Sequence, residues 1–587
     1  MSGKTGKTMQ TVKIGWRWAL LTLGLFASAA NATEFVDHRP VEPGFTIRLD
    51  VDLDGVKGGE RLYEIPGCLT LDLRMAGEDP KLKAYDMRDG NYLPFRRTDG
   101  TCPVLEAHMP GVRASRVGLP LGFLGGTGGV RRVVLNYAKT HVSIAVDGHM
   151  DDDMLLQPCP PVDPAKAKVL SARVKKADFV SPADPDALPL VKDARPIAGS
   201  VQYWTPADHN AWVGDVALGF YKGRFHVFYL YDRRHHASKA WKGGHFFAHI
   251  SSADLVHWEE HPHAVPIENW WETLGTGTPF EYDGKLHLAY GLHTSRCTKD
   301  PHYPMGATYA VSEDGIHFTK SGRIIHETQN PTIYNRADGT LGLVAGYGGM
   351  GGFWTSDSLN DWKLFDDKVP TKGDCPCPFE WNGHHYLFQG FNQFAYSSSG
   401  EPGTYVDWTK DGRAPYEGLS VPMVAPFTGN RRILAGWLSH RDGWGGWLVF
   451  RELIQHPDGT LGLKWVPEIA PPVAPQTFTA QPGKPFRLVF RPESGTGPAL
   501  VFAIDPATRE AAFHDDVPEV KWSEAHHAEN FRIRRLPTFT SSYAVRVVSY
   551  CDRKSDDTIF DVEIGGERTM ICRRKGRFRA PEENEGK

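Results

Sequence analysis

The sequence predicts an all-β protein: a five-bladed β-propeller flanked by an N-terminal lectin-like β-sandwich and a C-terminal β-sandwich. Three observations support this prediction. The chain of 587 residues contains 61 glycines and 43 prolines, and an all-β fold needs many turns. A strand–turn–strand pattern recurs about every 50 residues in the centre of the chain, as propeller blades do. Alternating apolar and polar stretches lie on both sides of that central region.

Residues 1–32 are predicted to be a secretory signal peptide. A lysine-containing lead is followed by a short apolar run from Trp18 to Ala29, and small residues at Ala30 and Ala32 form a cleavage pattern. The run is too short to favour a membrane span. We therefore expect a secreted or periplasmic protein without a membrane span in the mature chain, in a compartment that permits disulfides.

The composition excludes some partners. The net charge is −4, whereas proteins that bind nucleic acid usually carry a basic excess. The 17 tryptophans suit stacking on sugar rings, although tryptophan also fills cores. No cysteine pair has zinc-site spacing, so no metal is expected.

Cys551 with Cys572, and Cys68 with Cys102, are candidate disulfide pairs that the sequence leaves open.

The flanking regions are divided by composition. Residues 35–156 contain short alternating strands and are predicted to form the N-terminal sandwich. Residues 157–199 are rich in Pro, Ala, Lys and Asp without a sustained period and are predicted to be a linker. The propeller is predicted over residues 200–470. A proline-rich joint follows, and residues 477–579 are predicted to form the C-terminal sandwich.

Two recurring patterns mark the propeller. Tight-turn residues separate paired strands five times, at Gly223, Gly284, Gly339, Gly383 and Gly429. Between successive turns, a serine is followed six residues later by an aromatic residue, in the pairs Ser252 and Trp258, Ser312 and Phe318, and Ser356 and Trp362. Five turns predict five blades.

Two aspartates are predicted to lie at the mouth of this propeller. Asp215 precedes the first tight turn and Asp374 precedes the fourth, so each is expected to begin the innermost strand of its blade. Innermost strands converge on the axis, and carboxyls far apart in sequence can therefore meet there. Two carboxyl groups are the usual apparatus of glycoside hydrolysis, one as nucleophile and one as acid.

The central region resembles glycoside hydrolase family 32, the invertase, inulinase and levanase group. Trp212–Gly219 stands where that family has its nucleophile box. Asp254-Leu-Val-His-Trp258, Asp374-Cys-Pro376 and Arg451-Glu-Leu453 resemble three further family segments. The resemblance implies a retaining fructosidase that needs no cofactor, with Asp215 as nucleophile, Asp374 as acid/base, and an oligo- or polysaccharide as substrate.

Asn330 marks a departure from the family pattern. It stands where the family has an aspartate that steadies substrate hydroxyls, and it carries no charge. The resemblance implies that Asn330 holds the substrate, with Trp212, His249 and Trp271 lining the pocket. Two alternatives remain open: a hydrolase of the same fold acting on another sugar, such as an acidic keto-sugar or an arabinofuranoside, and a propeller that binds carbohydrate without catalysis.

Overall fold

The computed structural model describes most of the chain after the predicted signal peptide, which lies outside the described residues. The described residues are 33–34, 41–57, 59–76, 102–108, 116–121, 128–139, 141–155, 162–187, 190–208, 211–233, 245–269, 272–294, 304–328, 330–345, 352–367, 374–390, 393–401, 403–409, 412–415, 418–440, 444–515, 532–552 and 554–583. They are nearly all β, which confirms the predicted class. None of the helices within these ranges has the length and apolar content needed to cross a bilayer.

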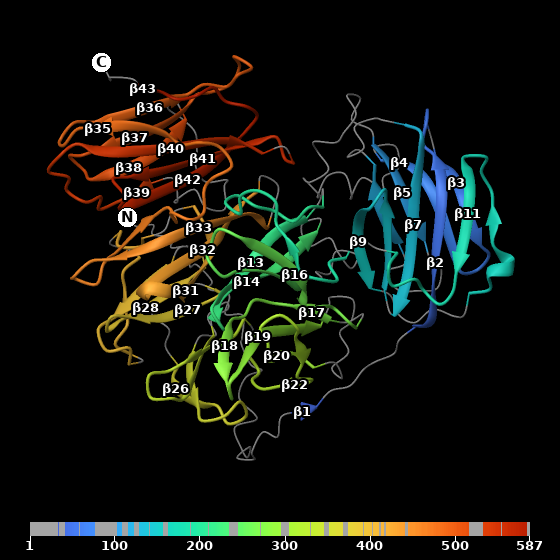
Figure 1. Cartoon of the computed structure of the whole chain (residues 1–587), viewed down its shortest axis with the longest axis horizontal. Helices are drawn as coiled ribbons and strands as arrows, with labels where there is room; N and C mark the ends of the chain where they lie inside the picture. Colours follow the sequence, from blue (N-terminus) through green and yellow to red (C-terminus); the bar gives the residue numbers. More distant parts are fainter. Residues whose placement is uncertain are drawn as a thin grey trace, which may run out of the picture.

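The N-terminal unit consists of two five-stranded antiparallel sheets around one apolar core (Figure 1). The strand orders are β10-β3-β4-β5-β6 and β11-β2-β7-β8-β9. The strands are β2 (Val41–Asp52), β3 (Glu60–Ile65), β4 (Leu69–Ala76), β5 (Cys102–His108), β6 (Arg116–Pro120), β7 (Val130–Lys139), β8 (His141–Val146), β9 (His149–Leu155), β10 (Lys168–Val169) and β11 (Val174–Val180), with a short 3-10 helix at Pro164–Lys166.

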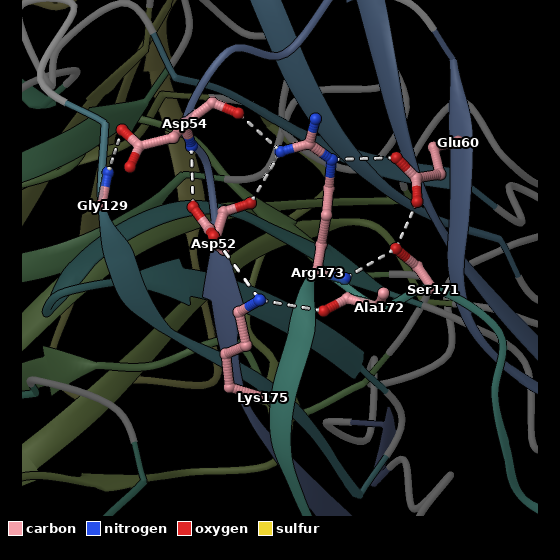
Figure 2. Close-up of polar contacts among 8 residues, drawn as sticks. All are labelled: Asp52, Asp54, Glu60, Gly129, Ser171, Ala172, Arg173 and Lys175. Atoms are coloured by element: carbon pink, nitrogen blue, oxygen red, sulfur yellow. Dashed lines mark hydrogen bonds and ion pairs between the residues drawn. The ribbon is translucent and has the colours of Figure 1, made fainter.

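The structure corrects the predicted linker, because β10 and β11 add strands to the two N-terminal sheets. Figure 2 shows the reason: Arg173, just before β11, ties this segment to β2 and β3. Its Nε donates to Glu60 at 2.9 Å, and its Nη1 donates to the carbonyls of Asp52 and Asp54 at 3.0 and 2.7 Å. Ser171 also donates to Glu60. Composition alone did not reveal these long-range bonds.

Four antiparallel sheets make the five blades of the propeller (Figure 1, green to orange), because the first and last blades share one nine-stranded sheet. Blade one is β13 (Ala211–Tyr221), β14 (Arg224–Arg233), β15 (Phe246–Ser252) and β16 (Trp258–Val265), with β12 (Arg195–Pro196) at its edge. Blade two is β17 (Glu272–Leu274), β18 (Pro279–Tyr282), β19 (Lys285–Thr294), β20 (Gly306–Ser312) and β21 (Thr319–Lys320); β22 (Arg323–Ile324) lies after it and pairs with β1 (Thr33–Glu34). Blade three is β23 (Thr332–Asn335), β24 (Leu341–Ala345), β25 (Gly352–Ser356) and β26 (Lys363–Asp366). Blade four is β27 (Cys377–Trp381), β28 (His384–Gln389), β29 (Gln393–Ser397) and β30 (Val406–Asp407). Blade five is β31 (Ser420–Phe427), β32 (Arg431–Ser439), β33 (Gly446–Gln455) and β34 (Leu461–Lys464), with a 3-10 turn at Thr428–Asn430.

The innermost strands form a closed ring. Strands β13, β18, β23, β27 and β31 each contact the next, and β31 contacts β13 again. The first and last blades are also joined directly, because Val213 of β13 pairs with Gly446 of β33. This ring places the innermost strands of all five blades around one axis.

The five predicted tight turns join the first and second strands of the five blades, as expected. In three of them both central residues have positive φ; for Asp283 and Gly284 the angles are 50° and 69°. This geometry matches strand twist and suits Asn, Asp and Gly.

The serine–aromatic pattern marks the turn between the third and fourth strands. The Ser252 hydroxyl accepts the Leu255 N–H at 2.8 Å, and the Asp254 carboxylate accepts the next two N–H groups at 2.8 Å each. Ser312 and Asp314 repeat this arrangement in blade two. The Asp254–Trp258 segment is therefore a self-capped turn that shapes the blade.

The C-terminal unit again has two sheets around one core, in the orders β35-β40-β41-β42 and β39-β38-β37-β36-β43. The strands are β35 (Gln476–Ala480), β36 (Phe486–Phe490), β37 (Leu500–Asp505), β38 (Glu510–Asp515), β39 (Arg532–Ile533), β40 (Tyr543–Cys551), β41 (Asp557–Ile564), β42 (Arg568–Lys575) and β43 (Glu582–Glu583). Cys68, Cys551 and Cys572 are free thiols, so neither candidate disulfide is formed.

A fully buried ion pair joins this unit to blade five. Arg451 Nη2 of β33 lies 2.8 Å from Asp561 Oδ1 of β41, and both side chains have no exposed area. The Asp561 carboxylate also accepts from Tyr203 at 2.6 Å and from the Trp465 indole at 3.1 Å. The charges therefore have several polar partners in the dry interface, which such a pair requires.

Candidate active site

Asp215 lies at an irregularity in the innermost strand of blade one. The register of β13 against β14 shifts between Val213 and Val216, so Gly214 and Asp215 form a β-bulge. A bulge redirects side chains out of the regular alternation. Glycine is required at position 214, because a Cβ there would lie 2.1 Å from the ring of Trp444. The carboxyl is 7% exposed and is thus held almost entirely inside the ring of blades.

Three groups from other blades surround the Asp215 carboxyl. The Thr276 hydroxyl of blade two donates to Oδ2 at 2.5 Å, and the Trp437 indole of blade five donates to Oδ1 at 3.2 Å. The Cys375 thiol of blade four lies 3.6 Å from Oδ2. The pKa of Asp215 is raised to about 6: burial and the nearby charge of Asp374 raise it, and the hydrogen bonds from Thr276 and Trp437 partly oppose the shift.

Thr276 reaches Asp215 because the innermost strand of blade two is interrupted. Strands β17 and β18 both pair with β19, and Thr276 lies in the gap between them. Gly277 permits this path, since a Cβ at this position would lie 1.7 Å from the Ala289 carbonyl oxygen. The interruption between β17 and β18 therefore allows the Thr276 hydroxyl to reach the Asp215 carboxyl.

Asp374 precedes β27 of blade four and is half-buried. Its Oδ1 accepts the Asn330 side-chain amide at 2.9 Å and the Cys375 N–H at 2.8 Å. Burial raises the pKa of Asp374, and these two bonds partly oppose the shift. Asn330 and Cys375 both have left-handed backbones, with φ of 47° and 51°. Backbone conformations of this kind persist where the surrounding contacts hold them in place, often at functional sites.

The structure thus brings Asp215, Asp374 and Asn330 into one network, linked through Cys375. The thiol of Cys375 lies near Asp215 while its backbone binds Asp374. Burial and the two carboxylates raise the pKa of this thiol well above its usual range. It therefore stays a neutral, compact group that separates the two acids.

The structure differs from the predictions for Trp212 and His249, which it places in the protein core. Trp212 is 2% exposed and packs on His440, with ring centroids 4.5 Å apart, and edge-on against Trp447. His249 has no exposed area and stacks on Phe228 at 4.4 Å. Neither residue is among the hydrogen-bond partners described above for the two carboxyls. Trp271 lies outside the described residues.

His249 belongs to a cluster of buried histidines within blade one. Its Nε2 lies 3.0 Å from His226 Nδ1, and its ring is 4.5 Å from that of His261. Burial lowers the pKa of His226 and of His261 to about 4. The rings are therefore neutral at neutral pH and fill the blade as polar aromatic packing.

Sequence reasoning did not select Thr276, Trp437 or His293 as site residues. His293 is half-buried beside Asn330: a Cβ at Gly275 would lie 2.5 Å from His293 Nε2 and 2.8 Å from Asn330 Oδ1. Burial lowers the pKa of His293 to about 4, so it presents a neutral hydrogen-bonding ring. The small residues of Gly275-Thr-Gly277 were an available signal, because paired glycines within a strand indicate close approach of other groups.

Comparisons with known proteins match the region that contains this site. The model of the glycosyl hydrolases family 32 N-terminal domain matches residues 209–382. Sucrose-6-phosphate hydrolase of Escherichia coli is 26% identical over 298 residues, which cover 43% of this chain and 61% of that protein. Raffinose invertase of Escherichia coli is 25% identical over 325 residues, which cover 45% and 65%. The chain thus spans less than two thirds of the length of these curated relatives.

Solved structures of similar architecture include a β-fructofuranosidase of Bombyx mori, with a TM-score of 0.46 and 17% identity, covering 65% of this chain and 89% of that one. Fructan 1-exohydrolase IIa of Cichorium intybus has a TM-score of 0.46 and 14% identity, covering 64% and 92%.

Proposed function

Because the chain is a divergent member of glycosyl hydrolase family 32, we propose that its propeller hydrolyses the glycosidic bond of a fructoside or related furanoside in an oligo- or polysaccharide. The observation that carries this proposal is the meeting of Asp215 and Asp374, from blades one and four, in one largely buried network. Two carboxyl groups, one ionised as nucleophile and one protonated as acid, are the equipment that glycoside hydrolysis uses.

Asp215 is suited to the part of nucleophile. Both of its oxygens accept hydrogen bonds, from Thr276 and from Trp437, and these donors favour the ionised form and fix its orientation. The ionised carboxylate attacks the anomeric carbon and forms a glycosyl-enzyme intermediate that water then hydrolyses. The fixed donors hold the attacking oxygens in place before the substrate arrives.

Asp374 is suited to the part of acid and base. Both bonds from the described residues fall on its Oδ1, so Oδ2 is the oxygen that holds and donates the proton. A raised pKa keeps that proton available as the leaving oxygen develops charge. After the first step, the same oxygen accepts a proton from the incoming water.

The test is identification of released sugars by chromatography on a panel of sucrose, levan, inulin and arabinofuranosyl glycosides, with Asp215→Asn as the matched inactive protein. The proposal predicts release of fructose from at least one of the fructosides by the native protein and none by Asp215→Asn. Release of an arabinofuranosyl sugar, with the fructosides untouched, would move the substrate to the second candidate, a hydrolase of the same fold acting on another sugar, which the replacement of the family aspartate by Asn330 favours. Saturable binding of a glycan from the panel without any released sugar would contradict the proposal that the protein is an enzyme.

Asn330→Asp is expected to move the alkaline limb of the kcat/KM profile to higher pH. The change removes a donor that stabilises ionised Asp374 at 2.9 Å and adds a second acid beside it, and both effects raise the pKa of Asp374. The protonated acid then persists to higher pH. The shift is expected to be about one pH unit or more. Asn330→Ala removes the donor alone, so it should shift the same limb less; equal profiles for all three proteins would contradict the assignment.

We propose that the enzyme acts outside the cytoplasm, on the evidence of the residue pattern of positions 1–32. Fractionation of cells expressing the full chain, compared with a chain lacking residues 2–32, tests this. Equal amounts in the cytoplasm for both chains would contradict it.

A further inference from the structure

A cavity lies far along the chain from the two carboxyls, where blades four and five meet the C-terminal sandwich. Its volume is about 590 Å³. The propeller contributes the segment around Arg413 and the turn between β33 and β34, and the sandwich contributes the β37–β38 turn, the segment after β39, and the start of β42. A volume of this order suits a small ligand such as one or two sugar rings.

The lining of this cavity is strongly basic. Five arginines line it, at positions 413, 509, 534, 535 and 568, against the two carboxylates of Asp458 and Glu510. Asp458 is occupied within its own turn, where it accepts the N–H and the hydroxyl of Thr460 at 3.0 and 2.6 Å. Glu510 lies 3.6 Å from Arg532 and 3.5 Å from Arg534. Among the described lining residues, positive charges therefore outnumber negative ones in a concave site, where such charge acts most strongly on anions.

Two of the arginines are held in strained, fixed positions. Arg509 and Arg535 have left-handed backbones, with φ of 58° and 56°, which arginine seldom adopts. They are locked together through Leu536: the Arg509 carbonyl accepts the Leu536 N–H at 3.0 Å, and Arg509 Nε donates to the Leu536 carbonyl at 2.7 Å. The bond from Nε fixes the guanidinium of Arg509, which lines the cavity. Strain that the surrounding structure maintains is characteristic of functional sites.

The cavity also has a fixed floor and a close junction between the two units. Arg568 is 6% exposed and its Nη1 donates to the Arg534 carbonyl at 3.0 Å, so a buried guanidinium braces the segment that presents Arg534 and Arg535. Gly412 of the propeller faces the stem of Arg534, since a Cβ there would lie 3.0 Å from Arg534 Cβ. The site is therefore built from both units.

We infer that this cavity binds an anionic saccharide, meaning a sugar that carries a phosphate, sulfate or carboxylate group. Planar guanidinium groups recognise these oxyanions with paired hydrogen bonds, and arginine is the preferred residue for that recognition. The volume beyond the anion accommodates the sugar ring. The site is separate from the Asp215–Asp374 network and stands whether or not the propeller is catalytic.

The test is isothermal titration of the full chain with glucose 6-phosphate, glucose 6-sulfate, glucuronic acid and glucose at matched ionic strength. We expect saturable binding of at least one charged sugar and none of glucose. Arg509→Gln combined with Arg535→Gln should weaken that binding at least tenfold. The matched control is Arg574→Gln combined with Arg577→Gln, which removes two arginines from a different basic cavity of the same sandwich and should leave binding unchanged.

Three outcomes would overturn the inference: no saturable binding of any charged sugar, equal loss in the control variant, or inorganic phosphate and sulfate binding as tightly as their sugar esters. The last would show a bare anion site. Unfolding midpoints of both variants check that the sandwich is intact. Hydrolysis of neutral glycosides should be the same in both variants and in the native protein, so failure of this inference and failure of the proposed hydrolase activity are distinguishable.

Discussion

Replacing Asp215 by asparagine is expected to lower kcat by roughly 10³- to 10⁶-fold, the range seen when one member of a catalytic unit is removed. The substitution keeps the shape of the side chain and its place in the bulge of β13. It removes the negative charge that attacks the anomeric carbon, and an amide does not replace it. Initial rates of sugar release, measured on the best substrate of the panel, check this expectation.

The same substitution is expected to stabilise the fold at neutral pH. Burial raises the pKa of Asp215 from 3.8 to about 6, so ionising this carboxyl costs the folded state free energy that the unfolded chain does not lose. At about 1.4 kcal/mol per pH unit, the cost above pH 6 is about 3 kcal/mol. Below pH 4 both states are protonated and the cost disappears. The gain of Asp215→Asn should therefore grow between pH 4 and pH 6 and stay constant above.

Asp283→Asn is the matched control for both measurements. Asp283 lies in a tight turn with φ of 50°, a conformation that asparagine adopts as readily, so activity and stability should be unchanged. Native activity in Asp215→Asn, or a loss of stability at pH 7 with normal activity, would contradict the role given to Asp215.

Arg451→Ala is expected to lower the free energy of unfolding by about 3–5 kcal/mol, because it leaves the Asp561 carboxylate buried without its cation. The substitution also removes the bond from Arg451 Nε to Thr569 at 3.1 Å. Arg451→Lys keeps the charge and should lose less. Urea unfolding followed by tryptophan fluorescence gives the values.

Lys285→Ala is the control for that comparison. Lys285 pairs with Glu313 at 2.9 Å, but the two side chains are 43% and 80% exposed, and surface pairs of this kind contribute about 0–1 kcal/mol. Should Arg451→Ala cost no more than Lys285→Ala, the buried pair does not hold blade five to the sandwich.

The fold was largely predictable because its signals are local. The turns at Gly223, Gly284 and Gly383 need positive φ, and short-range chemistry specifies them. The linker prediction was wrong for β10 and β11, because a polar edge strand carries little apolar alternation and gains its order from distant partners such as Glu60.

The candidate site was predictable only in its carboxyls. Asp215 and Asp374 stand in recognisable segments, and the structure brings them together. Thr276 and Trp437 were missed because they reach Asp215 only through the ring closure and the broken strand of blade two, which are properties of the whole propeller. His249 was predicted to line the pocket but packs in the core. A histidine in a strand can serve core packing or ligand binding, and the sequence does not distinguish the two.

The bond between the first and last blades has a consequence for biosynthesis. Val213 meets its partner Gly446 more than two hundred residues later, and the pairing lies directly beside the bulge that presents Asp215. Loop-closure entropy delays contacts of such long separation. The proposed nucleophile is thus positioned where the first and last blades join, so a nascent chain interrupted before blade five lacks the proposed catalytic centre even though Asp215 and Asp374 have already been synthesised.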